Sequence, residues 1–232
     1  MTLTNKVIVI TGASSGIGLK TALKAQELGA TVIAVSSHIE SREEVLCMIR
    51  GKSCCMNLDV TKEDEVKNFF FSLKQKYGKI DVLINCAGYV KPESMFFTSL
   101  ENWEKTLCVN LTGTFLCCKY ASLMMKELGG KIINIASTAG LTPRPGWSAY
   151  AAAKSGVINF SFAIAEELSS YNIKIFVICP GRTATPLRRI LAPAEDPKTI
   201  MQPETVAETI IFCLSDVADP MEGQPILVRE RF

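Results

Sequence analysis

The chain has 232 residues, a length that fits one α/β domain, and we predict a single domain over residues 1–232. Its formal net charge is +2, so no strong field points to nucleic acid or to a membrane surface, and we expect neither as a partner. The first apolar run, at 7–10, is too short for the core of a signal peptide, and we expect no stretch long enough to span a membrane.

Nine cysteines and one histidine, His38, limit the chemistry available to these residue types. The number of cysteines is odd and no pair has the Cys-x-x-Cys spacing, which argues against a disulfide framework. A single histidine leaves few ligand sets for zinc and no ready base for a catalytic cysteine. We therefore expect free thiols in a reducing, cytoplasmic compartment and no metal site.

Short apolar runs alternate with longer amphipathic ones along the chain. The predicted strands are 6–10, 31–35, 53–57, 82–85, 131–135, 174–178 and a weaker one at 225–228. The predicted helices are 17–28, 62–77, 100–125, 149–169 and 203–214. Thr61 and Asp64 match the capping signature for the second helix, and Gly78 should end it.

This alternation predicts a doubly wound (Rossmann) α/β fold, with a mostly parallel sheet of six to seven strands and helices on both faces. The apolar runs are continuous, as in strands that are covered on both sides. One irregular region, 181–201, contains three prolines and is expected to form a lid or a binding loop.

A glycine-rich turn follows the first predicted strand, with the sequence Thr-Gly-Ala-Ser-Ser-Gly-Ile-Gly at 11–18. Glycine is needed where a backbone turns sharply and approaches a pyrophosphate, and the next helix directs its free N–H groups at the anion. A plain strand-to-helix turn is the alternative. The position after a buried strand favours phosphate binding, and the residues concerned are Gly12, Ser14, Ser15, Gly16, Ile17 and Gly18.

The glycine spacing resembles that of the classical short-chain dehydrogenase/reductase (SDR) family, and more matches follow in the family's order. They are Asn57-Leu58-Asp59-Val60, Asn85-Cys86-Ala87-Gly88, Val109-Asn110, Ser137, Tyr150 with Lys154, and Pro180-Gly181-Arg182-Thr183-Ala184-Thr185-Pro186. The resemblance covers nearly the whole chain and implies a nicotinamide-dependent oxidoreductase. It adds these expected cofactor contacts: Asp59, Val60, Asn85, Ala87, Gly88, Tyr150, Lys154, Pro180, Gly181, Thr183 and Thr185.

Three features depart from the family pattern. Cys86 stands where the family has a second asparagine, and Phe176 stands where an asparagine is common. The family's Asp-Gly-Gly ending is missing from the C-terminus. That ending helps to form substrate pockets and one subunit contact in the family, so these two details of the resemblance do not carry over.

Tyr150 and Lys154 are the central candidates for catalysis. They lie four residues apart on a predicted helix and therefore share a face, where a fixed ammonium would lower the tyrosine pKa toward the working range. The resemblance implies that Lys154 also binds the nicotinamide ribose and that Ser137 holds the substrate oxygen. It implies that Asn110 positions a water in a proton relay. Each residue also has a purely structural alternative: a buried tyrosine, a solvated lysine, a loop serine and a polar break in an apolar helix.

The end of the second predicted strand bears on the choice between NAD and NADP. An acidic residue there binds the ribose 2′-OH and repels a 2′-phosphate. The position instead holds Ser36, followed by Ser37 and His38, which we predict to contact the cofactor. This favours NADP, with NAD as the alternative, although the basic residue of many NADP-dependent members is absent too. His38 could equally be a solvated loop residue.

We expect the substrate to be a small carbonyl or alcohol compound. Its pocket should form between 138–147, 89–97 and the loop after Pro186, where the apolar side chains are Phe96, Trp147, Leu187, Ile190 and Leu191. These favour an apolar or amphipathic substrate. Three arginines, Arg144, Arg188 and Arg189, could instead bind an acidic group, although solvation by water is the ordinary role of each.

Within the family, a 3-oxoacyl-carrier-protein reductase is our first hypothesis and a general alcohol dehydrogenase the second. The alternative from another class is a non-catalytic, dinucleotide-sensing binding protein on the same fold. A sugar epimerase would have a different glycine turn, and an enoyl reductase would have a wider tyrosine–lysine spacing. The helices predicted at 100–125 and 149–169 exceed what one sheet face can cover, and they pair between subunits in the family. We therefore predict a homodimer or homotetramer.

Overall fold

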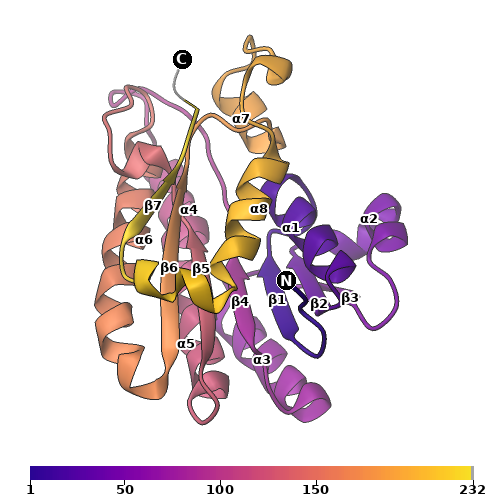
Figure 1. The fold of residues 1–232 in the computed structure, drawn as a ribbon. Helices are drawn as coiled ribbons and strands as arrows, with labels where there is room; N and C mark the ends of the chain where they lie inside the picture. Colours follow the sequence, from indigo (N-terminus) through magenta and orange to yellow (C-terminus); the bar gives the residue numbers. More distant parts are fainter. Residues whose placement is uncertain (231–232) are drawn as a thin grey trace.

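The computed structural model describes residues 1–230, and its centre is one parallel sheet of seven strands in the order β3-β2-β1-β4-β5-β6-β7 (Figure 1). The strands are β1 Val7–Thr11, β2 Thr31–Ser36, β3 Cys54–Asn57, β4 Val82–Asn85, β5 Gly130–Ile135, β6 Ile173–Pro180 and β7 Pro225–Val228. All seven predicted strands are present, and the predicted doubly wound fold is confirmed.

Helices cover both faces of this sheet. They are α1 Gly16–Glu27, α2 Glu43–Met48, α3 Glu63–Tyr77, α4 Leu100–Leu107, α5 Gly113–Met125, α6 Ser148–Leu168, α7 Pro186–Leu191 and α8 Pro203–Cys213. Short 3₁₀ turns lie at Ile39–Ser41, Thr138–Gly140, Ser169–Tyr171, Pro197–Thr199 and Asp216–Met221.

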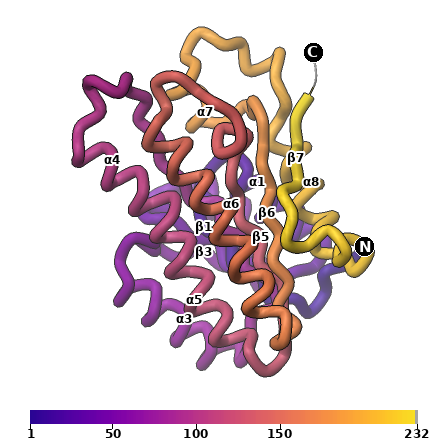
Figure 2. The backbone as a smooth tube through the Cα atoms, turned by 90° about the vertical axis from the view of Figure 1, so that its left-hand side faces the viewer, coloured from indigo at the N-terminus to yellow at the C-terminus, as the bar shows by residue number. Residues whose placement is uncertain are grey.

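Alternate residues of the inner strands supply two separate cores, one on each face of the sheet. On β1, Ile8 and Ile10 pack with α1 and α8, whereas Val7 and Val9 pack with α3 and α5. All four side chains are buried, because successive residues of a strand point to opposite faces. Figure 2 shows α6 beside α4 and α5 on one side, with α8 on the other. Burial on both faces explains why the strands are apolar throughout.

The start of α3 differs from the prediction. The residue that precedes the helix is Lys62 rather than Thr61, and it makes no capping side-chain bond. The Thr61 hydroxyl instead donates to Asp59 Oδ1 at 2.7 Å, so this side chain braces the loop after β3. The helix ends as predicted, at Gly78 with φ 73°.

The predicted helix at 100–125 contains a π turn, Cys108–Thr112, that separates α4 from α5. By length and composition this continuous helix could cross a membrane, so the expectation that no stretch would be long enough was wrong. One such helix is weak evidence for a membrane span, because core helices of soluble proteins have the same properties. Here Leu116, Cys117 and Ala121 are buried in the core against the sheet.

The region 181–201, predicted to be irregular, contains α7. Thr185 precedes this helix, and its Oγ1 accepts a hydrogen bond from Arg188 N at 3.1 Å, while Pro186 occupies the first helical turn. Both are recognised helix-start signals. The segment leaves and rejoins the domain at a parallel bridge between Thr183 and Met201, and α7 lies above the carboxyl ends of the strands (Figure 1).

Candidate active site

A cavity of about 780 Å³ opens at the carboxyl ends of the strands, where the strand order reverses between β1 and β4. Crevices at such points are the usual ligand sites of doubly wound sheets. These predicted site residues line the cavity: Gly12, Ser14, Ser15, Gly16, Ile17, Gly18, Ser36, Ser37, Asp59, Val60, Ala87, Gly88, Ser137, Tyr150, Lys154, Pro180, Gly181, Thr183 and Thr185. Three predicted residues lie outside its lining: His38, Asn85 and Asn110.

The glycine turn is packed too tightly for larger residues. Gly12 has φ 64°, and a Cβ atom there would lie 2.7 Å from the Cys86 carbonyl group. A Cβ on Gly18 would lie 2.4 Å from the Gly12 oxygen. The Thr11 hydroxyl oxygen accepts hydrogen bonds from the Cys86 and Ala87 N–H groups, both at 3.1 Å, and joins the turn to the loop after β4.

This turn presents the start of α1 to the cavity, and no acidic residue occupies the helix's first turn. The free N–H groups and the positive end of the helix dipole at this point favour an anion. The space over the glycine turn, which we call the glycine cradle, would be filled by a Cβ atom on Gly12. It therefore fits the pyrophosphate of a dinucleotide.

The far end of the cavity lies at the ends of β2 and β3. Ser36 and Ser37 line it, whereas His38 is exposed and its Nδ1 lies 2.9 Å from the Ser37 hydroxyl. His38, predicted to contact the cofactor, therefore lies outside the cavity lining, with its ring against the Ser37 hydroxyl. A carboxylate that the sequence analysis passed over, Glu40, accepts a hydrogen bond at 3.0 Å from the side chain of Asn57.

Asn85 supports the sheet instead of facing the cavity. Its side chain is buried and donates to Asn134 Oδ1 at 2.9 Å, and Asn134 in turn donates to Ser161 Oγ on α6 at 3.0 Å. A fully hydrogen-bonded network of this kind fixes β4, β5 and α6 relative to one another. These bonds give Asn85 a positioning role, and its contact with the cofactor stays a prediction.

Ser137 and Tyr150 meet at the near end of the cavity. Ser137 starts the 3₁₀ turn after β5, and its Oγ accepts from Ala139 N at 3.1 Å. Burial raises the pKa of Tyr150 to about 12, and a hydrogen bond with the Ser137 side chain partly offsets that rise. We predicted that Lys154 would lower this pKa, and the structure shows the opposite net direction. The tyrosine is consequently a protonated hydroxyl at neutral pH.

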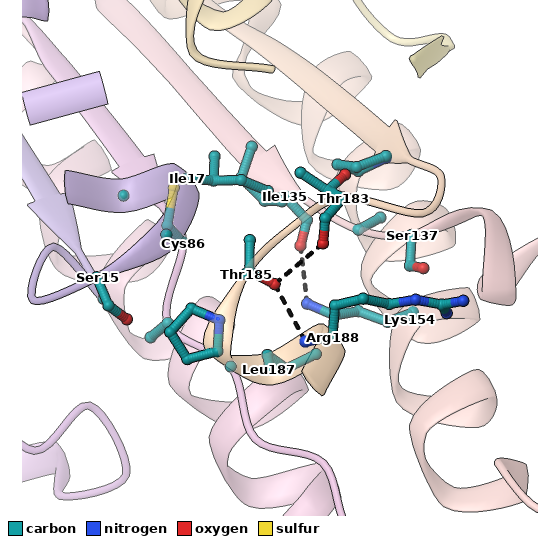
Figure 3. Close-up of a pocket in the computed structure, with 18 of the residues that line it drawn as sticks. Ser15, Ile17, Cys86, Ile135, Ser137, Lys154, Thr183, Thr185, Leu187 and Arg188 are labelled. Atoms are coloured by element: carbon teal, nitrogen blue, oxygen red, sulfur yellow. Dashed lines mark hydrogen bonds between the residues drawn. The ribbon is translucent and has the colours of Figure 1, made fainter. Parts of the chain in front are cut away.

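The Lys154 ammonium is buried beside the Tyr150 ring. Its buried Nζ donates to the Ile135 carbonyl oxygen at 2.8 Å, as Figure 3 shows, and lies 5.7 Å from the centre of the Tyr150 ring. Burial lowers the pKa of Lys154 to about 8. The bond to the Ile135 carbonyl oxygen holds the ammonium at the end of β5, beside the Tyr150 ring.

Asn110 is fully buried on the π turn, behind the cavity. Its Nδ2 donates to the Tyr89 and Thr106 carbonyl oxygens at 2.7 and 2.8 Å. Its Oδ1 lies 3.3 Å from where a Cβ of Gly88 would stand, so it supports the loop after β4. The water-positioning role of this side chain stays a prediction. π turns inside α-helices are frequent at functional sites.

The apolar side chains predicted for the substrate pocket fall into two groups. Trp147, Leu187 and Leu191 line the cavity. Phe96 is 95% exposed and Ile190 is 54% exposed, and both lie outside the lining. These two side chains project from the outer side of their segments, which hydropathy alone could not reveal.

Some cavity residues had been given no catalytic or cofactor role in the sequence analysis. Three of them, Ala136, Arg229 and Glu230, had not been named there at all. The others stood only in motifs, predicted elements or substrate loops: Leu58, Thr61, Cys86, Val109, Ile135, Thr138, Arg144, Arg182, Pro186 and Arg188. The available signal for Arg229 and Glu230 was their position directly after the last predicted strand. Parallel pairing of β7 with β6 carries that chain end to the same sheet edge as the other site residues.

Comparison with known proteins agrees with this geometry. The model of the short chain dehydrogenase family matches residues 6–196. The 3-oxoacyl-[acyl-carrier-protein] reductase FabG of Thermotoga maritima is 36% identical over 239 residues, covering 97% of each chain. The 3beta-hydroxysteroid dehydrogenase of Mediterraneibacter gnavus is 33% identical, covering 94% of this chain and 91% of its own.

A solved structure shares the fold of this chain over nearly its whole length. The crystal structure of a short-chain type dehydrogenase/reductase from Mycobacterium marinum superimposes with a TM-score of 0.90 at 31% identity, covering 98% of this chain and 95% of that chain. The match spans the glycine cradle, the Ser137–Tyr150 pair and the sheet edge that joins them. The chain therefore belongs to the short-chain dehydrogenase/reductase family, as an oxidoreductase that uses a nicotinamide dinucleotide.

Proposed function

We propose that this protein reduces the carbonyl group of a small substrate with NADPH, and that Tyr150 donates the proton. The observation that carries the proposal is that Tyr150 and Ser137 line the cavity into which the glycine cradle opens. Burial raises the pKa of Tyr150 to about 12, so its phenol is protonated at neutral pH. A neutral phenol is the form that can donate a proton to a carbonyl oxygen.

The bound nicotinamide would supply the hydride, which adds to the carbonyl carbon. The protein's part is to hold and protonate the oxygen. Ser137 orients the carbonyl oxygen toward the Tyr150 hydroxyl, and the phenolic proton moves to that oxygen as the C=O bond becomes C–OH. The phenolate that forms lies near Lys154, whose cation stabilises it until a solvent proton restores the phenol.

The Tyr150→Phe variant tests this mechanism, because it removes the proton donor and keeps the ring that packs at 6.5 Å from Trp147. We expect kcat to fall by about 10²- to 10⁴-fold, the usual range for a general acid, with unchanged NADPH affinity. Absorbance of the reduced nicotinamide gives the rate, and fluorescence titration gives the affinity. If turnover survives within a few-fold, Tyr150 is not the proton donor.

The preference for NADPH is supported by the end of β2. Ser36 and Ser37 line the cavity there, and neither repels a phosphate. The nearby Glu40 carboxylate accepts a hydrogen bond from Asn57 Nδ2 at 3.0 Å, and this bond holds the carboxylate against the protein. Parallel titrations with NADPH and NADH measure this preference directly.

3-Oxoacyl compounds are the first substrates to test, because two relatives named as 3-oxoacyl-[acyl-carrier-protein] reductases cover most of this chain. The second is 37% identical over 226 residues and comes from Synechocystis sp.. NADPH binding without turnover of any carbonyl compound would instead favour a dinucleotide-sensing protein.

We also propose that the protein acts in the cytoplasm as a homodimer or homotetramer. All nine cysteines are free thiols, which suits a reducing compartment. Phe115 and Leu123 are exposed on α5, and the Ser122 hydroxyl between them has no hydrogen-bond partner among residues 1–230. Light scattering at micromolar concentration tests the assembly, and a monodisperse monomer would refute it.

A further inference from the structure

Four arginines from separate segments line the cavity: Arg144 after β5, Arg182 after β6, Arg188 on α7 and Arg229 after β7. Two of them, Arg144 and Arg188, belong to the loops in which the substrate pocket was predicted. Two carboxylates accompany the arginines, Glu230 in the lining and Glu195 beside α7. This group of side chains therefore carries a net positive charge.

Arg188 is already fixed in place. Its Nε and Nη2 donate to the two oxygens of Glu195 at 2.6 and 2.9 Å, and both side chains are largely buried, at 17% and 15% exposure. The guanidinium also lies 5.8 Å from the centre of the Trp147 ring. Trp147 in turn meets Tyr150 edge to face. Figure 3 shows Arg188 in the same pocket as Ser137 and Lys154.

Arg144 and Arg229 differ from Arg188 in having no acidic partner within salt-bridge distance in the described chain, residues 1–230. Both are exposed yet line the cavity. Arg144 stands between two prolines, at 143 and 145, which restrict the backbone that carries it. A cation held by a stiff loop at a cavity mouth loses little conformational entropy when it binds an anion.

We propose that the substrate carries an oxyanion, a carboxylate or a phosphate, that Arg144 and Arg229 bind while its carbonyl lies against Ser137 and Tyr150. The inference rests on the carbonyl reduction proposed above and narrows its substrate class. Within 3-oxoacyl and other carbonyl compounds, it favours those that carry an acidic group near the reacting carbon over neutral substrates such as steroids. Guanidinium groups bind carboxylate and phosphate through paired, charge-assisted hydrogen bonds.

The effect should appear in substrate binding. The anionic group lies away from the reacting carbon, so its contacts stabilise the bound substrate and the transition state equally, and such contacts lower KM with little change in kcat. A hydrogen bond to a charged group is usually worth about 1.5 to 3 kcal/mol, so each arginine should change KM by about 10- to 100-fold.

Two matched pairs of substrates test the charge at saturating NADPH. They are acetoacetate against ethyl acetoacetate, and dihydroxyacetone phosphate against dihydroxyacetone. We expect one anion to exceed its neutral partner in kcat/KM by at least about ten-fold, in line with that hydrogen-bond energy. Preference for acetoacetate identifies a carboxylate, and preference for the phosphate ester identifies a phosphate. Equal rates within both pairs would overturn the proposal.

Three single variants locate the binding site. Arg144→Gln and Arg229→Gln should raise KM for the preferred anion and leave KM for its neutral partner unchanged. Arg189→Gln is the control, since Arg189 has the same charge and lies on α7 beside Arg188 but outside the cavity lining. If Arg189→Gln has the same effect as the other two, general surface charge is the cause and the proposed site is wrong.

A binding measurement separates this inference from the proposed reaction. The chain has two tryptophans, so a Trp103→Phe background leaves Trp147 as the only one. With bound NADP⁺, acetoacetate or dihydroxyacetone phosphate should change the Trp147 fluorescence saturably, and adding Arg144→Gln and Arg229→Gln should abolish the change. A saturable change without turnover would refute the reaction and keep the anion site. No saturable change with either anion would refute the anion site.

Discussion

The two ends of the cavity are built in different ways. At the cofactor end the backbone makes the surface: a glycine turn under Cys86, a hydroxyl of Thr11 that ties two strand ends, and the start of α1. At the substrate end the surface is made by long side chains from α7, the loop after β5 and the residues after β7. The first end depends on close packing, and the second depends on charge.

This difference determines how each end should respond to substitution. A surface made of backbone atoms cannot accommodate an added methyl group, because the main-chain atoms that the methyl group meets cannot move independently. A side-chain surface can exchange one residue for another and change its ligand without disturbing the sheet below. The cofactor end should therefore show large losses and the substrate end graded ones.

The largest expected effect comes from Gly12→Ala. The new Cβ would lie 2.7 Å from the main chain of Cys86, so the turn must move and the anion cradle must open. We expect NADPH affinity to fall by at least about 100-fold, since several N–H contacts to a charged phosphate are lost together. Fluorescence titration measures the loss.

Gly51→Ala is the control for this experiment. Gly51 has a similar φ of 71°, but nothing lies within 4 Å of its added Cβ. Both substitutions therefore place alanine at a positive φ, but only Gly12→Ala brings a Cβ atom into collision with the main chain. If both variants lose affinity equally, positive φ and not close packing limits the turn.

The next largest effect concerns the end of β2. Ser36→Asp places a carboxylate in the cavity lining, where it can accept from a ribose 2′-OH and repel a 2′-phosphate. We expect the repulsion to lower NADPH affinity by about 10- to 100-fold, which corresponds to about 1.4 to 2.8 kcal/mol. NADH affinity should rise, because NADH has a 2′-OH and no 2′-phosphate. Ser41→Asp, on the neighbouring 3₁₀ turn and outside the lining, is the matched control. Unchanged preference in Ser36→Asp would place the 2′ position elsewhere.

Lys154 lies between the two ends and gives a pH-dependent prediction. Burial lowers its pKa from 10.5 to about 8, so between these values the unfolded chain binds more protons than the folded one. Stability contributed by this residue therefore rises with pH through that window, by up to about 1.4 kcal/mol per pH unit, and is absent below it. The free energy of unfolding of wild type minus that of Lys154→Met, measured by urea titration at pH 7, 8 and 9, should rise. A flat difference would mean that Lys154 titrates normally.

The smallest expected effect concerns α7. Glu195→Gln removes the charge that holds Arg188 and Arg182, and we expect amides of residues 186–195 to exchange hydrogen about 5-fold faster, as for a loss of about 1 kcal/mol. Glu44→Gln, whose partner Arg42 is exposed and 4.0 Å away, should leave exchange in its own helix nearly unchanged. Equal protection of α7 in both variants would show that packing alone holds it.

The sequence could predict the cofactor end because its requirements are local. A buried strand, a glycine spacing and a helix start are adjacent in the chain, and the seven strands were all recognisable by their apolar runs. Tyr150 and Ser137 were found in the same way, through motifs that stand next to predicted strand ends or helix starts.

The substrate end was predicted less well because its residues meet only in three dimensions. Arg229 reaches the cavity through the pairing of β7 with β6, and Phe96, expected to line it, points into solvent. The direction of the Lys154 side chain depends on a carbonyl 19 residues earlier in the chain. The start of α7 was a missed local signal, since Thr185 before Pro186 is a recognisable helix start.

The π turn at Cys108–Thr112 fixes the rotational phase of the helix that contains it. Relative to a plain α-helix it amounts to one additional residue, and each residue advances the helix by about 100° about its axis. Deleting one residue from this turn would leave α5 packed on the sheet and rotate α4 by roughly that angle. Asn102, now hydrogen-bonded to the Lys91 carbonyl oxygen at 3.1 Å, would swing out of reach. The single turn therefore sets which side of α4 supports the loop beside the active site.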